Sequence, residues 1–336
     1  MMNKPLISVL IATYNVGKYL EAALRAVMAQ SYRNLEIIVV NDGSPDNTAE
    51  ILTRLAAEDA RIRVLHNPHN LGIVASLNKG LEVIKGDYVA RTDSDDLTEP
   101  DWIESLYQVM EQRPDVLAMS AYMAPMHEVE SGHLGRTIQA DQILTGPVGH
   151  KAVQRHILLH GSPLYNPCAL IRGSVFTQHG LRYEDYPYAE DYKFWLEVSK
   201  IGQLDNLPRP LGHYRLHTQQ VSSAYQEIQM QTARRIRHEA VDHYLHTLGL
   251  NGLPENITAA DNLMLADQLS SLLPEHTDAD ILTHLFYESL MSQTTYSWRE
   301  LTAILRHPTV RRYLSAKQKR KLIKKYLRPR KYQNML

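Results

Sequence analysis

Three aspartates lie within segment 92–96 (TDSDD), and their spacing is typical of a metal-binding site. Side chains two residues apart in an extended backbone lie on the same side, so Asp93 and Asp95 are expected to point the same way. Carboxylates this close repel one another unless a cation lies between them, and their oxygens suit Mg²⁺ or Mn²⁺ shared with a diphosphate. The alternative is a solvated acidic loop that caps the following helix, and the segment alone fits both.

Two further polar segments follow apolar runs earlier in the chain. Segment 12–15 (ATYN) contains Thr13 and Tyr14, and the backbone groups at such a strand end could bind a nucleobase. Segment 41–44 (NDGS) contains Asp42, whose carboxylate could accept a base N–H or a ribose hydroxyl. The alternatives are an ordinary strand–helix turn at the first segment and an Asx turn that caps a helix at the second.

Two later segments carry a candidate base and candidate metal ligands. Asp191 lies at the start of a predicted helix, where it could accept the proton of an acceptor hydroxyl. An acid at a helix N-terminus is also stabilised by the helix dipole, so capping is the alternative role. His213 and His217 in segment 213–217 (HYRLH) could ligate a metal, although most of the 16 histidines are expected to be structural or exposed.

The elements that must position these residues alternate between strand and helix over the first third of the chain. Continuous apolar runs predict buried parallel strands, and apolar residues at helical spacing predict the helices between them. This alternation is typical of an α/β fold with a mostly parallel sheet flanked by helices, whose ligands bind at the carboxyl ends of the strands. The predicted strands are residues 7–12, 35–40, 61–65, 88–91 and 116–120, and the predicted helices are residues 16–30, 48–58, 72–84 and 99–112.

The pattern changes twice in the rest of the chain. Residues 123–165 lose periodicity and are predicted to form a loop-rich insertion over the cleft, with one short helix at 152–159. From residue 225 only helical patterns are present. We therefore expect a catalytic domain at 1–224 and a helical region with a basic tail at 225–336. Between these two stretches the sequence predicts a strand at 168–172, a helix at 190–201 and a strand at 211–215.

Composition narrows the class of protein. A formal net charge of −1 gives no general reason to expect nucleic-acid binding. The single cysteine cannot form an intrachain disulfide, which suits a cytoplasmic protein. The N-terminus does not resemble a secretory signal, and no apolar run reaches the roughly 18 residues that a transmembrane helix needs. The expected location is the cytoplasm, either free or on the inner face of the cytoplasmic membrane.

The C-terminal tail is strongly basic. Residues 317–331 contain nine lysines and arginines and no acid. Leu322, Ile323, Tyr326 and Leu327 fall on one face at helical spacing, which predicts a basic amphipathic helix. Such a helix is attracted to an anionic membrane surface, where a lipid-linked acceptor would be found. The alternative is a terminal helix whose apolar face packs on the catalytic domain.

Six ordered segments of the chain resemble the family 2 glycosyltransferases. The segments are PLISVLIATYNVGKYL, LEIIVVNDGSPDNT, HNLGIVASLNKGL, DYVARTDSDD, AEDYKFWLEV and HYRLHTQQVS. The resemblance covers about residues 5–224 and leaves the helical region outside it. It implies a GT-A fold and metal-dependent, inverting transfer of a sugar from a nucleotide-diphosphate donor, as in bacterial surface-polysaccharide or lipopolysaccharide synthesis.

The resemblance also assigns donor-binding roles. Thr13 and Asp42 would contact the nucleobase, with Tyr14 nearby, and Asp93 would bind the ribose or a water on the metal. The implied donor is a UDP-sugar, either a UDP-hexose or a UDP-N-acetylhexosamine. The implied acceptor is a hydroxyl of a glycan or of a lipid-linked molecule.

Metal and catalytic roles follow from the same resemblance. Asp95 would ligate the Mn²⁺ or Mg²⁺ that holds the diphosphate, and His217 is similar to the family's C-terminal metal-side histidine. Asp191 would be the catalytic base. One departure is Leu77, which stands before Asn78 where many members have arginine, so one diphosphate or base contact would be missing or supplied elsewhere.

Other functions fit the sequence less well. A sugar nucleotidyltransferase would have a glycine-rich loop after the first strand, and a dinucleotide dehydrogenase would have GxGxxG there. This chain instead reads ATYNVGKY, with one glycine. A catalytically inactive, transferase-like scaffold would have lost the acids, whereas both Asp95 and Asp191 are present.

Overall fold

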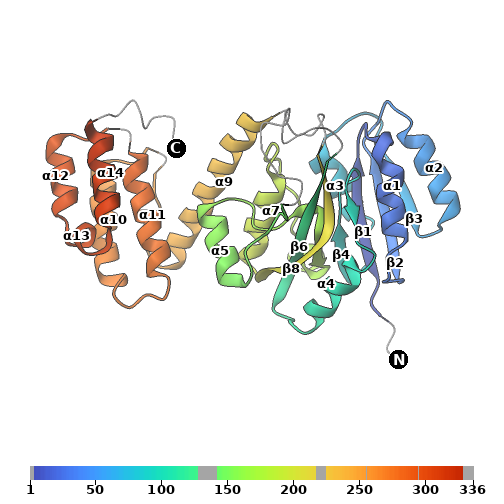
Figure 1. Ribbon diagram of the computed structural model, residues 1–336, viewed down its shortest axis with the longest axis horizontal. Helices are drawn as coiled ribbons and strands as arrows, with labels where there is room; N and C mark the ends of the chain where they lie inside the picture. Colours follow the sequence, from blue (N-terminus) through green and yellow to red (C-terminus); the bar gives the residue numbers. More distant parts are fainter. Residues whose placement is uncertain (1–3, 128–141, 217–224, 255, 294, 328–336) are drawn as a thin grey trace. The chain divides into compact units, whose positions relative to one another are not determined.

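The computed structural model describes residues 4–127, 142–216, 225–254, 256–293 and 295–327 (Figure 1). The candidate metal ligand His217 lies outside these residues. Residue contacts define two compact units, Met1–Ile236 and Arg237–Leu336, and each has its own hydrophobic core. The division falls inside helix α9 (Gln226–Thr247), whereas the boundary proposed from the sequence, between residues 224 and 225, assigns all of α9 to the second domain.

The first unit is built on one eight-stranded sheet with the strand order β3-β2-β1-β4-β7-β6-β8-β5. Strands β1 to β4 run parallel to one another, and Thr13 of β1 pairs with Asn41 of β2, so these two strands end at the same edge. The strands predicted for this part of the chain are confirmed, with ends shifted by a residue or so. They are β1 (Ile7–Thr13), β2 (Leu35–Asn41), β3 (Ile62–His66) and β4 (Tyr88–Arg91).

The direction of the sheet reverses at β7 (Ala169–Arg172). This strand is antiparallel to both of its neighbours, β4 and β6 (Val116–His127). Strand β8 (Gln203–Leu216) then pairs parallel with β6, and β5 (Leu97–Thr98) pairs antiparallel with β8. The sheet is therefore mixed but mostly parallel, in agreement with the predicted fold class. The sequence did not predict β5, because two residues are too short to show periodicity.

Strands β6 and β8 are longer than the sequence predicts. The expected loop-rich insertion is wrong at its start, because β6 continues to His127. Ala121 pairs with Leu207 and Tyr122 with Pro210, so the two residues between these partners, Pro208 and Arg209, form a bulge in β8. Proline usually argues against a strand, and here the prolines of β8 fall where the ladder is already interrupted.

Helices cover both faces of the sheet. Ile7, Val9 and Ile11 of β1 belong to a cluster with side chains of α1, α2 and α4, whereas Leu10 points to the opposite face, against α3. A Cβ added to Gly80 of α3 would lie 2.2 Å from Leu10 Cδ1, so only glycine permits this close approach. The helices of this unit are α1 (Gly17–Met28), α2 (Thr48–Glu58), α3 (Ile73–Leu81), α4 (Trp102–Glu111), α5 (His150–Leu159), α6 (Ser174–Thr177) and α7 (Glu190–Ser199).

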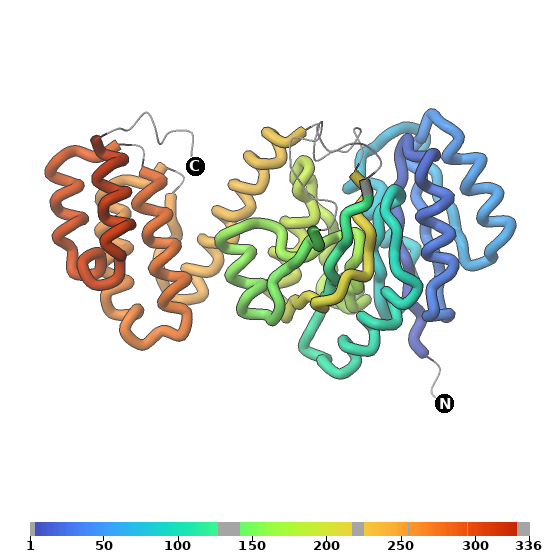
Figure 2. Tube along the Cα trace, in the orientation of Figure 1, coloured from blue at the N-terminus to red at the C-terminus, as the bar shows by residue number. Residues whose placement is uncertain are grey.

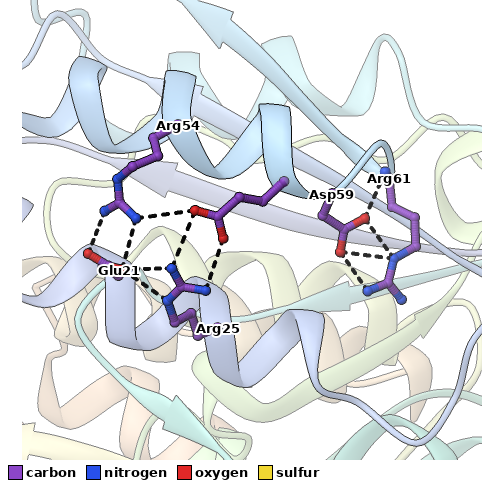
Figure 3. Close-up of polar contacts among 6 residues, drawn as sticks. Glu21, Arg25, Arg54, Asp59 and Arg61 are labelled. Carbon is purple, nitrogen blue, oxygen red and sulfur yellow. Dashed lines mark hydrogen bonds and ion pairs between the residues drawn. The ribbon is translucent and has the colours of Figure 1, made fainter.

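Ion pairs join the exposed surfaces of α1 and α2 (Figure 3). Arg54 Nη2 lies 2.6 Å from Glu21 Oε2, and Arg25 Nη1 lies 3.1 Å from Glu58 Oε2. The ionised carboxylate of Glu21 accepts hydrogen bonds from Arg54 and Arg25, and these lower the pKa of Glu21 to about 2. Because all four side chains are exposed, the network aligns the two helices without adding much to stability.

Cys168 lies where three strands of the first unit meet. Its side chain is fully buried, and its thiol packs on the β8 backbone, since a Cβ added to Gly212 would lie 3.3 Å from Cys168 Sγ. Burial raises the pKa of the thiol well above its usual value. The thiol therefore behaves as a small apolar group in the core.

The second unit is helical throughout the part that the structure describes, as the sequence predicts (Figure 2). Reciprocal capping boxes begin two of its helices, between Thr258 and Asp261 at α10 and between Ser297 and Glu300 at α12. No helix among the described residues combines the length and the apolar character needed to cross a bilayer. The helices that follow α9 are α10 (Ala259–Leu272), α11 (Ala279–Ser292), α12 (Trp298–Arg306), α13 (Pro308–Tyr313) and α14 (Ala316–Leu327).

The apolar residues of α14 do not share one environment. Leu322 is fully buried in the core of the second unit, and Tyr326 packs against that core. Ile323 and Leu327 are exposed. The single apolar face predicted from the sequence is therefore divided between the core of its own unit and the solvent.

Candidate active site

Three polar segments meet at the carboxyl edge of the parallel strands. The order β2-β1-β4 makes neighbours of the segments that begin after Asn41, Thr13 and Arg91. The backbone N–H of Asp42 donates to the carbonyl of Thr13 at 2.9 Å, which ties two of the segments together. The structure thus brings the predicted donor-site residues to one edge, as expected for a ligand site in a sheet of this type.

Thr13 and Tyr14 lie at that edge and differ in their exposure to solvent. Thr13 is buried, and its Oγ1 has no hydrogen-bond partner among the residues that the structure describes. Tyr14 is 44% exposed. The next residue, Asn15, has a φ of 54° and donates its N–H to Ser44 Oγ at 3.1 Å, which turns the chain sharply into α1. A buried hydroxyl without a partner carries a free-energy penalty, so a ligand group that hydrogen-bonds to it would be stabilised.

Asp42 holds the loop that leads into α3. Its Oδ1 accepts hydrogen bonds from Asn67 Nδ2 at 2.6 Å and from the N–H of Leu71 at 2.9 Å, and its Oδ2 accepts one from the N–H of Gly72 at 2.9 Å. The helix-capping Asx turn considered from the sequence is made by Asp46 instead, whose Oδ1 accepts the N–H of Thr48, the first residue of α2, at 3.2 Å. Asp42 is therefore a positioning residue in this structure, and its Oδ2 still has a lone pair for a ligand.

The acidic segment after β4 forms a compact cluster. Asp93, Asp95 and Asp96 each offer a carboxylate oxygen within 4.8 Å of the others. The guanidinium of Arg91, which is buried, lies 2.5 Å from Asp93 Oδ1. Burial raises the pKa of Asp93, and the charge of Asp95 adds to this effect. Three carboxylates that repel one another this closely would be relieved by a divalent cation, so the donor set fits a hard metal ion.

Arg215 holds this cluster from the end of β8. Its N–H donates to Asp96 Oδ1 at 2.8 Å, its Nε donates to the carbonyl of Asp95 at 2.6 Å, and its guanidinium lies 4.7 Å from the ring centre of Tyr19. Asp96 Oδ2 is buried without a hydrogen-bond partner among the described atoms, and burial raises the pKa of Asp96 well above its usual value. This role of Arg215 was not predicted from the sequence, although segment 213–217 was considered for its histidines.

Of the two histidines of that segment, the described part of the chain includes His213 and not His217. His213 lies in β8 and pairs with Glu99, with 2.7 Å between His213 Nε2 and Glu99 Oε1, so its ring is engaged by this carboxylate and not by the acidic cluster. The role of His217 stays a proposal, because this residue lies outside the described part of the chain.

Asp191 and Glu190 begin α7, as predicted. Asp191 Oδ1 accepts the N–H of Tyr192 at 2.7 Å, and Asp191 Oδ2 lies 3.4 Å from Ser162 Oγ. Burial raises the pKa of Asp191 to about 6, and the negative charge of Asp93 adds to the rise. Burial and repulsion from Asp191 raise the pKa of Glu190 to about 7. The negative charge of Asp93 in the acidic cluster therefore raises the pKa of both acids. Their pKa values suit the exchange of protons near neutral pH.

The loop before α7 contains an unusual residue. Tyr188 has a φ of 60°, which is rare for a bulky side chain. Its ring stacks on Tyr225 with 4.3 Å between the ring centres, and its carbonyl accepts a hydrogen bond from Gln229 Nε2 at 2.8 Å. Contacts with α9 therefore fix the conformation of the loop that carries Asp191. These contacts could not be found from the sequence, because both partners lie in the part without recognisable motifs.

Family membership agrees with this geometry. The chain belongs to glycosyltransferase family 2, whose profile, described as "Glycosyl transferase family 2", matches residues 8–180. An uncharacterized glycosyltransferase of Haemophilus influenzae (strain Rd) is 36% identical over 331 residues, which cover 98% of each chain. Glycosyltransferase GlyG of Streptococcus pneumoniae serotype 4 is 43% identical over 118 residues, 35% of this chain and 39% of its own length. The chain is therefore a nucleotide-sugar glycosyltransferase.

Two solved structures share the fold. S. aureus TarS 1-349 in complex with UDP-GlcNAc has a TM-score of 0.57 and 17% identity, covering 96% of this chain and 91% of that chain. The mannosyltransferase PcManGT from Pyrobaculum calidifontis, in complex with GDP-Man and Mn²⁺, has a TM-score of 0.52 and 17% identity, covering 99% and 84%. At this identity the likeness concerns the fold alone, and it confirms the predicted GT-A-like architecture.

Proposed function

We propose that the chain transfers a hexose or N-acetylhexosamine from a UDP-sugar to a hydroxyl of a glycan or lipid-linked acceptor, with inversion of the anomeric centre. The observation that carries this proposal is the acidic cluster at the carboxyl edge of the parallel strands, with the candidate base Asp191 close enough for the charge of Asp93 to raise its pKa. A site of this kind brings a proton acceptor and a diphosphate-binding region to one strand edge. A catalytically inactive scaffold would have no need for such a pair of acids.

The donor would bind across the ends of β1, β2 and β4. The unpartnered Thr13 hydroxyl supports a hydrogen bond to the nucleobase, and the exposed ring of Tyr14 lies beside it in the chain. Asp42 would accept a base N–H on its available lone pair while it holds the loop before α3. Asp93 would bind the ribose or a water on the metal. The UDP-GlcNAc in TarS supports UDP as the nucleotide, and the GDP-Man in PcManGT is the main alternative.

The acidic cluster would hold one Mn²⁺ or Mg²⁺ ion through Asp95, with His217 completing the site. When bound, such an ion supplies positive charge next to the departing nucleoside diphosphate. The Mn²⁺ in PcManGT supports this assignment. Arg215 and Arg91 keep Asp95 and Asp93 in position, so the carboxylates do not have to reorganise when the ion binds.

Asp191 would act as the general base. Hydrogen bonds from Tyr192 and Ser162 orient its carboxylate, and its raised pKa makes it a better proton acceptor than an ordinary aspartate. As the acceptor hydroxyl attacks the anomeric carbon, its proton passes to Asp191 and the anomeric C–O bond to the diphosphate breaks. One displacement inverts the centre, so an α-linked donor gives a β-linked product.

The remaining proposals concern the setting of the reaction. We propose that residues 1–224 form the catalytic domain and residues 225–336 a separate helical domain. The expected location is the cytoplasm, and a lipid-linked acceptor would bring the enzyme to the inner face of the cytoplasmic membrane. Synthesis of a surface polysaccharide or lipopolysaccharide is the process that suits such an acceptor.

The test of the function is a panel of UDP- and GDP-sugars with and without Mn²⁺. We expect one donor to raise the thermal midpoint in the presence of Mn²⁺ and to release its nucleoside diphosphate. Asp191→Asn should keep the stabilisation by that donor and lose turnover, since it removes a proton acceptor at nearly constant shape. Donor binding lost together with turnover would make Asp191 a binding residue, and an unchanged rate would make it a helix cap.

A further inference from the structure

The second unit exposes a group of apolar side chains on α12 and α14. Trp298 is 65% exposed, Leu327 is 67% exposed and Ile323 is 36% exposed. The core of this unit already contains Leu322 from α14 and Leu301 from α12, so the exposed residues are additional to the packed face. Large apolar groups left in water are unfavourable, and a group of them with an aromatic member often marks a binding surface.

Trp298 contacts α14, and Ile323 and Leu327 lie on one side of that helix. The Trp298 ring lies 5.9 Å from the Tyr326 ring between centres, which joins the first turn of α12 to the last turn of α14. Leu327 follows Tyr326 directly, and Ile323 is one helical turn before Leu327 on the same side. Figures 1 and 2 show α12 and α14 next to each other in the second unit. We call the group formed by Trp298, Ile323 and Leu327 the apolar patch.

Exposed basic side chains lie on the same two helices as the apolar patch. Arg320, Lys321 and Lys324 are exposed on α14, and Arg299 is exposed next to Trp298. Positive charges outnumber negative ones on these helices, since no acidic residue follows Glu300 in the sequence, and the charge of Glu288 on α11 acts on Lys325. Lys325 is different, because its Nζ is buried and donates to the carbonyl of Met291, which fixes α14 to α11. The surface therefore combines exposed positive charge with exposed apolar side chains on a helix that is held in place.

We propose that the apolar patch and its basic rim dock the protein on an anionic lipid bilayer. Tryptophan and leucine beside lysine and arginine suit the boundary between headgroups and acyl chains, where apolar side chains enter and basic ones stay with the phosphates. A nucleic acid would use the positive charge but would leave Leu327 and Ile323 in water. A second copy of the chain would bring like charges together across the contact. The proposal goes beyond sugar transfer and is tested without any donor or acceptor.

The test uses the fluorescence of Trp298 in the full-length protein. The chain has three tryptophans, and Trp102 and Trp195 are fully buried, so a change in solvent exposure is reported by Trp298. Vesicles of phosphatidylglycerol and phosphatidylcholine should shift the emission to shorter wavelength, and brominated acyl chains should quench it. Trp298→Phe should remove this response while most flotation with the vesicles persists. Pure phosphatidylcholine vesicles should give a much weaker effect at every salt concentration.

Matched variants separate the apolar and basic contributions. Ile323→Gln with Leu327→Gln should lower vesicle affinity by about tenfold or more. Met264→Gln changes another exposed apolar residue of the same unit, 42% exposed on α10, and should leave affinity unchanged. Lys321→Gln with Lys324→Gln should weaken binding to anionic vesicles and reduce its salt dependence.

Several results would overturn the proposal. One is that the protein does not float with anionic vesicles at low salt and remains in the soluble fraction. Another is equal loss of binding in the Met264 control and in the double glutamine variant of the apolar patch. Binding to heparin that matches vesicle binding without a shift in Trp298 emission would point to a general polyanion surface. A self-associated protein that Leu327→Gln makes monomeric would point to an interface between copies.

Discussion

Arg215 Nε donates a hydrogen bond of 2.6 Å to the backbone carbonyl of Asp95, and the Arg215 N–H donates one of 2.8 Å to the carboxylate of Asp96. One residue at the end of β8 thus holds both the backbone and a side chain of the acidic cluster. Its guanidinium lies over Tyr19 of α1, so its own position is fixed by a third element. The geometry of the cluster therefore depends on a residue that need not touch the metal.

Arg215→Lys is expected to weaken metal use. Lysine keeps the positive charge but has no Nε donor and no planar group to stack on Tyr19, so the Asp95 loop loses its support. The Mn²⁺ concentration for half-maximal transfer should rise by about tenfold, as is usual for residues that orient metal ligands. Arg209→Lys is the control, because Arg209 is exposed and pairs with Asp101. A Mn²⁺ titration that matches wild type would show that Arg215 does not position the cluster.

Asp95→Ala should abolish transfer and stabilise the metal-free protein. Removing one of three crowded carboxylates relieves repulsion on Asp93 and Asp96, so in EDTA the free energy of unfolding should rise by about 1 kcal/mol. The measurements are product formation with Mn²⁺ and thermal midpoints with and without EDTA. An active Asp95→Ala enzyme, or a wild-type enzyme insensitive to EDTA, would rule out a metal role for Asp95.

The activity should depend on pH through Asp191 and Glu190. A base works only when deprotonated, and the pKa values of Asp191 and Glu190 are raised to about 6 and about 7, so kcat should fall as the pH drops through that range. Because Glu190 has the higher pKa, it is mostly protonated while Asp191 titrates, so in Glu190→Gln the acidic limb should stay close to about pH 6 and lose any step near about pH 7. An acidic limb that moves well away from about pH 6 in this variant would mean that Asp191 does not set it.

The raised pKa values of Asp191 and Glu190 should also lower the stability of the folded protein as the pH rises. An acid whose folded pKa lies above its unfolded value binds its proton better in the folded state, so stability falls as the pH rises from the unfolded pKa of about 4 through the folded pKa. Asp191→Asn should therefore increase the free energy of unfolding by about 1–2 kcal/mol at pH values above about 7 and change it little near about pH 4. Urea unfolding in EDTA at the two pH values measures this. An equal effect at both would argue for a packing change instead.

Thr13→Val should separate stability from donor binding. Valine has nearly the same shape and removes the buried, unpartnered hydroxyl, so the free energy of unfolding should rise by about 1 kcal/mol. Donor affinity should fall about fivefold, the value of one hydrogen bond. In the control Thr309→Val, the lost hydroxyl donates to the carbonyl of Ala266, so stability should fall and donor affinity should not change. Unaltered donor affinity in Thr13→Val would remove Thr13 from the donor site.

The parts of the fold that the sequence predicts are those that depend on local pattern. β1 and β2 are buried on both faces, and each appears in the sequence as a continuous apolar run followed by a polar segment. Parallel strands end at one edge, so the neighbourhood of Thr13, Asp42 and Asp93 followed from the strand predictions alone. The family resemblance added roles to these residues but was not needed to bring them together.

The features that the sequence does not predict depend on distant contacts. Arg215 meets Asp95 across 120 positions of sequence, and no periodicity records such a contact. Asp42 has the pattern of a ligand-binding residue, yet three donors from the loop before α3 already use its carboxylate. The sequence does not show that β8 continues through Pro208, because a proline at a bulge looks the same in the sequence as a proline that ends a strand.

The burial of Cys168 gives the protein a built-in reporter of unfolding. It is the only thiol in the chain, and it lies in the core of the first unit against the β8 backbone. A maleimide cannot reach it until β6, β7 and β8 separate, so the labelling rate measures the opening of that unit alone. Any cysteine added elsewhere for a dye or a spin label would react selectively in the native protein, without first removing the natural one.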